Sequence, residues 1–598
     1  MIQFRSVLFF SILILLNCST TPDEPIDVVF ENYYQERIGF NPIESTISGD
    51  IAYNDTLPNL ISDEYQTKQL AFYEKYLTKL EQFNPDNLSE AQRVSRDVLL
   101  WELDIKIEGL QNVIPVTTSP QFGLPIIELM PLNQIFSLHL YIGQLGSGSS
   151  AQPFNTVQDY ENWLSRMDDY FDILDTAMLR MQEGIDMGFV HHKVITQKMI
   201  KQLDDFILTP IDEHVFFTPV LNLPDAISAE EKTQIEEDYR KMITERLVPK
   251  YKELQNFLTE SYLPASVETA GIGELPNGKE TYEYLVRVHT STDMSPDEIH
   301  RLGLSEVERI EGEMEKIKDL VGFKGDLNAF FNHVRTSPEQ MPFTKPEQVI
   351  ENFEKMHERM KPQLEKLFDM TPKAGFVVRR TEAFREASAS AEYNSGSKDG
   401  SRPGVFYVPI PNVKKYNKFS DESLFLHEAI PGHHYQLSLQ QENEALPSFM
   451  HTEGLGVYVE GWALYSESLG KELGLYTDPY QYFGMLSAEM HRAIRLVVDT
   501  GMHAKGWTRE QAIQFSLEHE AESEASITSE IERYMVAPGQ ALSYKIGQLK
   551  ILELRERSKE KLGEKFDIRE FHNQVLNSGS LPLEILEQNI DRWISESK

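Results

Sequence analysis

The stretch Phe425–Gln436 reads FLHEAIPGHHYQ: a His-Glu pair, then Pro-Gly, then a His-His pair. Two acidic residues follow Ser420, just upstream, and this pattern favours a helix start because acidic side chains complement the helix dipole in the first turn. The helix expected from Ser420 therefore carries His427 and Glu428. Imidazole and carboxylate groups are metal ligands and proton carriers, so we expect this chain's chemistry at this stretch.

The spacing of these residues departs from the regular zinc motif H-E-x-x-H, in which two histidines four apart share one helix face and the glutamate activates a water. The residue four after His427 is Pro431. In an unbroken helix His433 lies about 240° around the axis, and His434 lies roughly 10 Å along it. Zinc–nitrogen bonds are about 2.0–2.1 Å long, so neither histidine can join His427 unless the helix is interrupted.

Pro431 and Gly432 are the residues expected to interrupt the helix. Proline removes its own amide from the hydrogen-bond ladder and clashes with the carbonyl four residues earlier, which belongs to His427. Looping out two residues here would bring His433 to the usual ligand position, so we favour His433 as the second ligand. His434 remains the alternative, and otherwise it supports the site or faces the substrate.

A third ligand is available downstream. Glu460 follows His433 by 27 residues, in the segment YVEGWALYSE, and Glu467 lies two helical turns further on the same face. A carboxylate on a later helix that packs against the motif helix would complete a two-histidine, one-glutamate site for Zn²⁺.

Several blocks of sequence carry a resemblance. HEAIPGHHYQ, EGWALYSE, RLVVDTGMHAKGW, ERYMVAPGQALSYKIG and the earlier LPNGKETYEYLVRVHT resemble the bacterial family of domain of unknown function 885, over roughly residues 45–595. That family is distantly similar to the thermolysin-like zinc peptidases of the Taq carboxypeptidase and thimet oligopeptidase type. Those enzymes have H-E-x-G-H, and Gly432-His433 aligns with its Gly-His, whereas Pro431 departs from the pattern.

The resemblance implies a role for each residue of the metal site. His427, His433 and Glu460 would hold Zn²⁺ and leave one position open. Glu428 would be the general base that takes a proton from the attacking water and passes it to the leaving amine.

The resemblance also implies groups that contact the substrate. Tyr534 and Tyr544 are candidate donors to the developing oxyanion, with core packing as the alternative for both. Arg533 is a candidate receiver of a substrate carboxylate, because its planar guanidinium matches that group. The strand expected at Val405–Val408 would pair with an extended peptide if it lay at a sheet edge.

Arg495, Asp499 and His503 recur at four-residue spacing on one face of a predicted helix. Structural ion pairing explains this spacing. The alternative is that Asp499 or His503 orients one of the ligand imidazoles.

The N-terminus predicts export and lipid anchoring. Arg5 precedes the apolar run Val7–Leu16, which is too short to span a bilayer, and the run ends at Asn17 and Cys18, the chain's only cysteine. This arrangement resembles a bacterial lipobox. We therefore expect a signal peptide over 1–17, a lipidated Cys18 with a tether to residue 30, and an envelope protein that touches the membrane only through its anchor. The alternative is an ordinary signal peptide with an incidental cysteine.

For residues 31–598 the sequence pattern predicts a single, mainly α-helical domain. It could have two lobes, with the metal-site half at about 375–550. Ser295 opens a capping box for a helix through about Leu320, and Pro346 opens another through about Met370. Short strands expected near 375–380 and 404–409 form a small β element next to the active-site helix. With the resemblance, this is a zincin-like metallopeptidase fold.

Composition restricts the partners. The formal net charge of −37 argues against a nucleic-acid partner, because phosphate binding needs a basic surface. The function expected is zinc-dependent hydrolysis of peptide bonds in oligopeptides. Two alternatives remain: a non-catalytic peptide-binding or scaffold lipoprotein, and a zinc hydrolase of a non-peptide amide.

Overall fold

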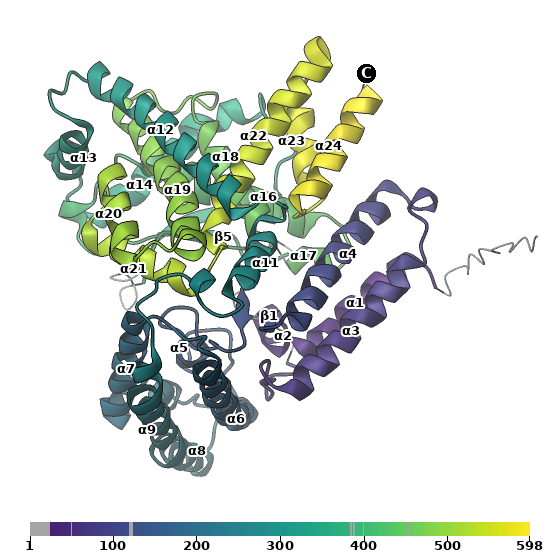
Figure 1. Cartoon of the computed structure of the whole chain (residues 1–598), viewed down its shortest axis with the longest axis vertical. Helices are drawn as coiled ribbons and strands as arrows, with labels where there is room; N and C mark the ends of the chain where they lie inside the picture. The colour runs from purple at the N-terminus through teal and green to yellow at the C-terminus, as the bar shows by residue number, and fades with distance from the viewer. Residues whose placement is uncertain are drawn as a thin grey trace, which may run out of the picture.

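The computed structural model describes residues 24–49, 51–118, 124–382, 386, 389–398, 400–452 and 454–597. Over these ranges the chain is mainly helical, with two small sheets, as the sequence predicts (Figure 1). None of the helices described there is long and apolar enough to cross a membrane. The predicted signal peptide and Cys18 lie outside the described residues.

The N-terminal segment is helical earlier than expected. The residues Ile26, Val29 and Phe30 are buried on the first helix, which packs against α3, so the predicted tether is wrong from residue 26 onward. Their spacing places them on one helix face, and burial of that face outweighs the polar start of the segment. The elements here are α1 (Ile26–Phe40), α2 (Pro42–Ser48), α3 (Asp63–Glu81), α4 (Glu90–Gln111) and the antiparallel pair β1 (Val116–Thr118) and β2 (Pro125–Ile127).

A second group of helices forms the lower part of the molecule in Figure 1. Its longest member begins at a capping box between Thr156 and Asp159 and ends at Gly188, whose left-handed φ of 77° suits glycine. The helices are α5 (Leu138–Leu145), α6 (Val157–Met187), α7 (Lys193–Leu208), α8 (Ala229–Lys241), α9 (Val248–Phe257) and α10 (Leu263–Ala265).

The predicted capping boxes mark the starts of two long helices. Ser295 caps α12, which runs from Pro296 to Leu320 as predicted. The next predicted helix starts at Pro346 but ends at Leu364, earlier than expected, because the residues that follow turn into the core. The helices of this region are α11 (Gly278–Thr290), α12 (Pro296–Leu320), α13 (Leu327–Thr336) and α14 (Pro346–Leu364).

The small sheet has three strands in the order β3 (Phe376–Arg380), β5 (Gly404–Val408), β4 (Glu392–Asn394). The central β5 is parallel to β3 and antiparallel to β4. The expectation that Val405–Val408 offers a free edge is therefore wrong. The sequence did not predict β4, which pairs with the side of β5 expected to stay open.

The C-terminal half positions the site. Its α18 and α22 cross closely, because a Cβ on Gly461 would lie only 2.5 Å from the Cα of Gly547. This contact brings the residues beside Gly461 next to the start of α22. The helices are α15 (Asp421–Glu428), α16 (His433–Glu442), α17 (Phe449–Thr452), α18 (Gly456–Ser468), α19 (Pro479–Lys505), α20 (Arg509–His519), α21 (Glu524–Val536), α22 (Ser543–Leu562), α23 (Ile568–Leu576) and α24 (Leu583–Ser597).

Candidate metal centre

The motif helix is interrupted where Pro431 and Gly432 predict. The first segment, α15, ends at Glu428 and α16 begins at His433. A Cβ on Gly432 would lie 1.9 Å from the carbonyl oxygen of His427, so only glycine lets the chain turn back this closely. The carbonyl of Pro431 accepts a hydrogen bond of 2.8 Å from the indole of Trp462, which ties the break to α18.

The break brings three potential ligands together. Nε2 of His427 lies 3.4 Å from Oε2 of Glu460, and Nε2 of His433 lies 3.5 Å from the same oxygen. One ligand atom from each residue lies within 4.8 Å of the others, and the two imidazole planes are 84° apart. Two imidazoles and one carboxylate form a donor set that zinc uses in catalytic sites, with a fourth position open.

The surroundings of the Glu460 carboxylate suit a bound cation. Oε2 of Glu460 is buried and has no hydrogen-bond partner among the residues that the structure describes, although it faces two imidazole nitrogens. A buried acceptor without a partner is unfavourable by about 1–3 kcal/mol, or more for a charged group. A zinc ion among His427, His433 and Glu460 would remove this deficit, so the residues present fit the metal.

The electrostatics of the three residues point the same way. Burial lowers the pKa of His427, but the carboxylates of Glu460 and Glu467 outweigh burial and raise that pKa to about 10. Burial raises the pKa of Glu460, but the charges of His433 and His427 hold it well below its ordinary value. Because a metal ligand must be deprotonated, zinc would displace the proton that His427 holds in the metal-free chain.

Glu467 orients the first ligand. Nδ1 of His427 bonds to Oε1 of Glu467 at 2.8 Å, and the hydroxyl of Ser423 donates to the other oxygen of the same carboxylate. This bond fixes the tautomer and leaves Nε2 directed at the site, as carboxylate partners of metal-bound histidines do.

The orienting role suggested for Asp499 or His503 falls to Glu467 instead. Asp499 accepts hydrogen bonds from the hydroxyl of Tyr282 at 2.6 Å and from the amide of Gly539, while His503 bonds to backbone groups. The ion pairing predicted along this helix face is also wrong, because the Arg495 guanidinium pairs with Glu530 on α21.

His434 points away from the three ligands. Its Nδ1 lies 2.9 Å from the hydroxyl of Tyr393 on β4, and its ring lies against Phe376 on β3 at 4.8 Å between centroids. Burial lowers the pKa of His434 to about 4. The structure thus places His434 between α16 and the small sheet, outside the group of ligands to which it was the alternative candidate.

Glu428, the candidate base, is buried at the end of α15. Burial raises its pKa, and the nearby charges of His427 and His433 oppose that rise. A carboxyl whose pKa moves up toward neutrality is better matched to accepting a proton from water.

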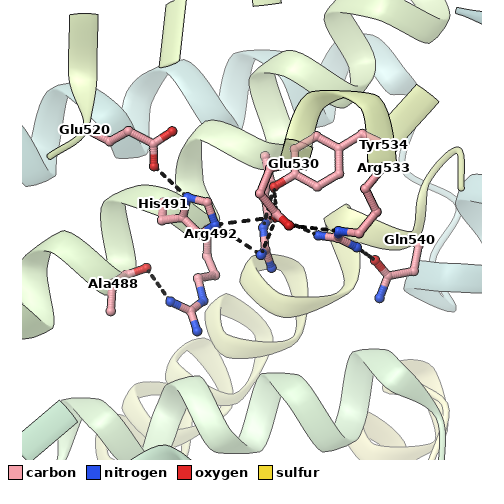
Figure 2. Close-up of polar contacts among 9 residues, drawn as sticks. Ala488, His491, Arg492, Glu520, Glu530, Arg533, Tyr534 and Gln540 are labelled. Carbon is pink, nitrogen blue, oxygen red and sulfur yellow. Dashed lines mark hydrogen bonds and ion pairs between the residues drawn. The ribbon is translucent and has the colours of Figure 1, made fainter. Parts of the chain in front are cut away.

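The remaining candidates differ in their hydrogen bonds, although the Arg495 guanidinium lies 4.6 Å from the ring centre of Tyr544 and 5.8 Å from that of Tyr534. Tyr544, at the start of α22, is half-buried, and the charge of Glu460 contributes to its raised pKa, after burial as the main cause. Tyr534 and Arg533 lie in another group, which we name the Glu530 cluster: Glu530 with His491, Arg495, Arg533 and Tyr534 (Figure 2).

In the Glu530 cluster, the hydroxyl of Tyr534 and the guanidinium of Arg533 are both held by hydrogen bonds to neighbouring side chains. The hydroxyl of Tyr534 donates to Glu530 at 2.7 Å and accepts from Nε of Arg495 at 2.9 Å. Arg533 donates to Glu530 at 2.9 and 3.1 Å and to Gln540 at 2.6 Å. The hydroxyl of Tyr534 is therefore engaged within the cluster, whereas the printed contact of Tyr544 is its ring against the Arg495 guanidinium, at 4.6 Å.

The fold and site together define a mainly helical protein with a buried two-histidine, one-glutamate site. The chain belongs to the family described as bacterial protein of unknown function (DUF885), whose model matches residues 42–590.

Two solved structures are similar over nearly the whole chain. One is titled the "putative lipoprotein from Colwellia psychrerythraea", with 28% identity, a TM-score of 0.86, and coverage of 96% of this chain and 99% of that one. The other is titled "a putative lipoprotein of unknown function from Shewanella oneidensis", with 19% identity, a TM-score of 0.74, and coverage of 94% and 99%. No curated protein matches the chain.

Proposed function

We propose that this protein is a zinc-dependent hydrolase of peptide bonds in oligopeptides. The observation that carries the proposal is the convergence of His427, His433 and Glu460 on one point, where Oε2 of Glu460 has no hydrogen-bond partner in the described part of the chain. The presence of Glu428 beside these ligands favours an enzyme over a binding module, because binding alone needs no general base. The resemblance to thermolysin-like peptidases supports a peptide as the substrate.

The residues divide the reaction between them. Zinc, when bound by the two histidines and Glu460, polarises the scissile carbonyl and makes water a better nucleophile. Glu428 accepts a proton from the attacking water, whose oxygen bonds to the carbonyl carbon. The carbon–nitrogen bond then breaks, and Glu428 passes the proton to the departing amine. We assign donation to the developing oxyanion to Tyr544, because the charge of Glu460 acts on its pKa and no other group engages its hydroxyl among the described residues.

A Glu428→Gln variant tests the proposal. We expect it to retain zinc, because Glu428 is not among the three converging ligands, and to lose turnover of an oligopeptide mixture by roughly 10²–10⁴-fold. Glu444→Gln is the matched control, since Glu444 is exposed on the surface, and it should retain both properties. Product formation is followed by mass spectrometry, and zinc by elemental analysis. Undiminished turnover in Glu428→Gln would contradict the assigned base.

We also propose that the protein is anchored in the cell envelope by lipid on Cys18. The apolar run before this cysteine and the titles of the two similar structures support the proposal. Cys18→Ser should abolish incorporation of labelled fatty acid and move the protein from the membrane fraction to the soluble fraction. Unchanged membrane association in this variant would refute lipid anchoring at Cys18.

A further inference from the structure

A cavity lies where α11 and β2 meet the segment that follows α21. Its walls come from β2, from residues 130–136, from Leu285 and His289 on α11, and from residues 535–538. Figure 1 shows α11 between the lower group of helices and the C-terminal helices. The volume open to the centres of water molecules is about 40 Å³, which gives room for about three waters or one aliphatic side chain.

The described residues that line the cavity carry no charge. Apart from Asn133 and two histidines, all of them are apolar. Burial lowers the pKa of His191 and the pKa of His289 to about 4, so both imidazoles are neutral near neutral pH. A charged group buried here would find no counter-charge, which is strongly unfavourable, whereas an apolar side chain gains by leaving water. The cavity therefore suits an uncharged, aliphatic occupant.

The imidazole of His289 lines the cavity without a hydrogen bond to any described residue. The ring of His191 differs, because its Nε2 bonds to the carbonyl of Leu132 at 2.8 Å. The backbone carbonyl of His289 accepts a hydrogen bond from Ser543, but burial alone acts on the ring of His289. A neutral imidazole has one donor and one acceptor, so this ring is available to the peptide group of an occupant.

A short series of contacts leads from the cavity wall to the candidate metal centre. The hydroxyl of Ser543, the neighbour of Tyr544, donates to the carbonyl of His289 at 2.8 Å and lies 3.7 Å from the position of a Cβ on Gly456. Glu460 follows Gly456 by four residues on α18, so it lies on the same helix face about 6 Å further along. The whole path is on the order of 12–15 Å, the length of about four residues of extended peptide.

The cavity walls are packed against the elements that carry the site. The α11 helix contacts both α18 and α22. Gly539, with a left-handed φ of 83°, lies against α11, since a Cβ there would be 3.2 Å from the carbonyl oxygen of Leu285. Its amide donates to Asp499 on α19, and Gln134 donates to the carbonyl of Glu532 on α21 at 3.0 Å. These contacts hold the cavity and the candidate metal ligands in one packed unit.

We propose that this cavity receives an aliphatic side chain of leucine size from the peptide substrate, within about four residues of the bond that is cut. The proposal rests on the proposed function and narrows its substrate class. An apolar cavity with few polar groups is typical of a ligand site, and a side chain held there contributes binding energy away from the reacting bond. The uncharged lining disfavours charged side chains, and the volume disfavours aromatic ones.

Binding to the full chain tests the proposal without turnover. The Glu428→Gln protein is titrated by calorimetry with an acetylated and amidated peptide of eight alternating alanine and serine residues. Further peptides carry one leucine, phenylalanine or lysine at each position in turn. We expect leucine at one position to tighten binding about 10–50-fold over the parent peptide, because burial of its additional carbon atoms is favourable. Lysine and phenylalanine should give no such gain.

Two substitutions in the cavity should change this preference in different ways. Ala537→Phe adds a ring to the cavity wall and should abolish the preference for leucine. Ala226→Phe, at an exposed position outside the cavity, is the matched control and should leave the preference intact. Leu285→Ala enlarges the cavity and should move the preference from leucine to phenylalanine, which a loss of stability alone would not do. If Ala537→Phe fails to fold, Leu285→Ala decides the test.

Equal binding of the leucine peptides and the parent peptide overturns the proposal, as does a leucine preference unchanged in the cavity variants. Tighter binding of lysine or phenylalanine peptides by the wild-type cavity assigns another occupant and also overturns it. With Glu428 intact, mass spectrometry should find the cut at a constant distance from leucine. A leucine preference without cleavage of any peptide contradicts the proposed hydrolysis and leaves the cavity as a binding site. Cleavage without a leucine preference contradicts the cavity assignment alone.

Discussion

Two glutamates in the C-terminal half, Glu460 on α18 and Glu530 on α21, lie among cationic or potentially cationic side chains but are bonded differently. Glu530 accepts hydrogen bonds of 2.7–3.1 Å from two guanidinium groups and a tyrosine hydroxyl (Figure 2). Oε2 of Glu460 faces imidazole nitrogens at 3.4 and 3.5 Å and makes no hydrogen bond among the described residues.

This difference separates a structural cluster from a ligand site. The half-buried carboxylate of Glu530 is already compensated by several donors, so its role is to hold α19 and α21 together. Oε2 of Glu460 makes no such bonds among the described residues, so its charge is compensated by protonated imidazoles or by a cation that lies between them. Glu460 and Glu530 should therefore respond to substitution in different ways.

The largest effect is expected on zinc affinity in Glu460→Gln. Removal of a direct ligand should weaken zinc binding by more than the roughly 10–100-fold that loss of an outer partner causes. Competition with a chromogenic chelator measures the affinity. If this variant bound zinc as tightly as the wild type, Glu460 would not be a metal ligand, and the distinction from Glu530 would fail.

Glu530→Gln should act on stability and not on zinc. It leaves two guanidinium groups without their carboxylate, and because Glu530 is half-buried we expect the loss of these charged hydrogen bonds to cost about 1.5–3 kcal/mol of unfolding free energy. Chemical denaturation measures the loss, and zinc content should be unchanged. A variant that lost zinc but kept its stability would reverse the roles assigned to the two glutamates.

The effect of Glu530 should depend on pH in a defined direction. Burial raises its pKa, but His491, Arg495 and Arg533 hold it far below the ordinary value of 4.5. Its contribution is therefore complete above about pH 4.5 and is lost as the pH falls below that value. The stability difference between the wild type and Glu530→Gln should shrink as the pH falls below about 4.5. A difference that grew in acid would contradict the ion-pair assignment.

Glu467→Gln should have an intermediate effect on zinc. The variant keeps the three ligands but weakens the acceptor that orients His427, so zinc affinity should fall by about 10–100-fold. Chelator competition again gives the value, with Glu444→Gln as the control. An unchanged affinity would show that the bond to Glu467 does not tune the site.

The smallest effect is expected for Tyr534→Phe. Its hydroxyl joins Arg495 to Glu530, and loss of these bonds should lower stability by about 1–3 kcal/mol. Turnover should be retained, whereas Tyr544→Phe should reduce it. A large loss of turnover in Tyr534→Phe, with normal stability, would indicate that Tyr534, and not Tyr544, is the oxyanion donor.

The sequence was sufficient to predict the features that depend on local helix geometry, namely the break in the motif helix and the choice of His433. Helical periodicity and the properties of Pro431 and Gly432 are enough to predict a break in the motif helix. If two residues are looped out at that break, His433 and not His434 reaches the ligand position. Glu460 is predicted in another way, by its place 27 residues after His433 and by the resemblance to the zinc peptidases.

Features that depend on contacts between distant segments were not predictable from the sequence. The pairing of β4 with β5 closed the strand expected to be open, and the engagement of Tyr534 and Arg533 depends on how α21 packs against α19.

Zinc content of the purified full chain, by elemental analysis after exposure to zinc and removal of the excess, tests the central claim most directly. We predict about one zinc ion per chain, as expected for a site of three protein ligands, with near-complete loss in His433→Ala and retention in His434→Ala. A chain that takes up no zinc, or a His433→Ala variant that binds as much as the wild type, would contradict the account.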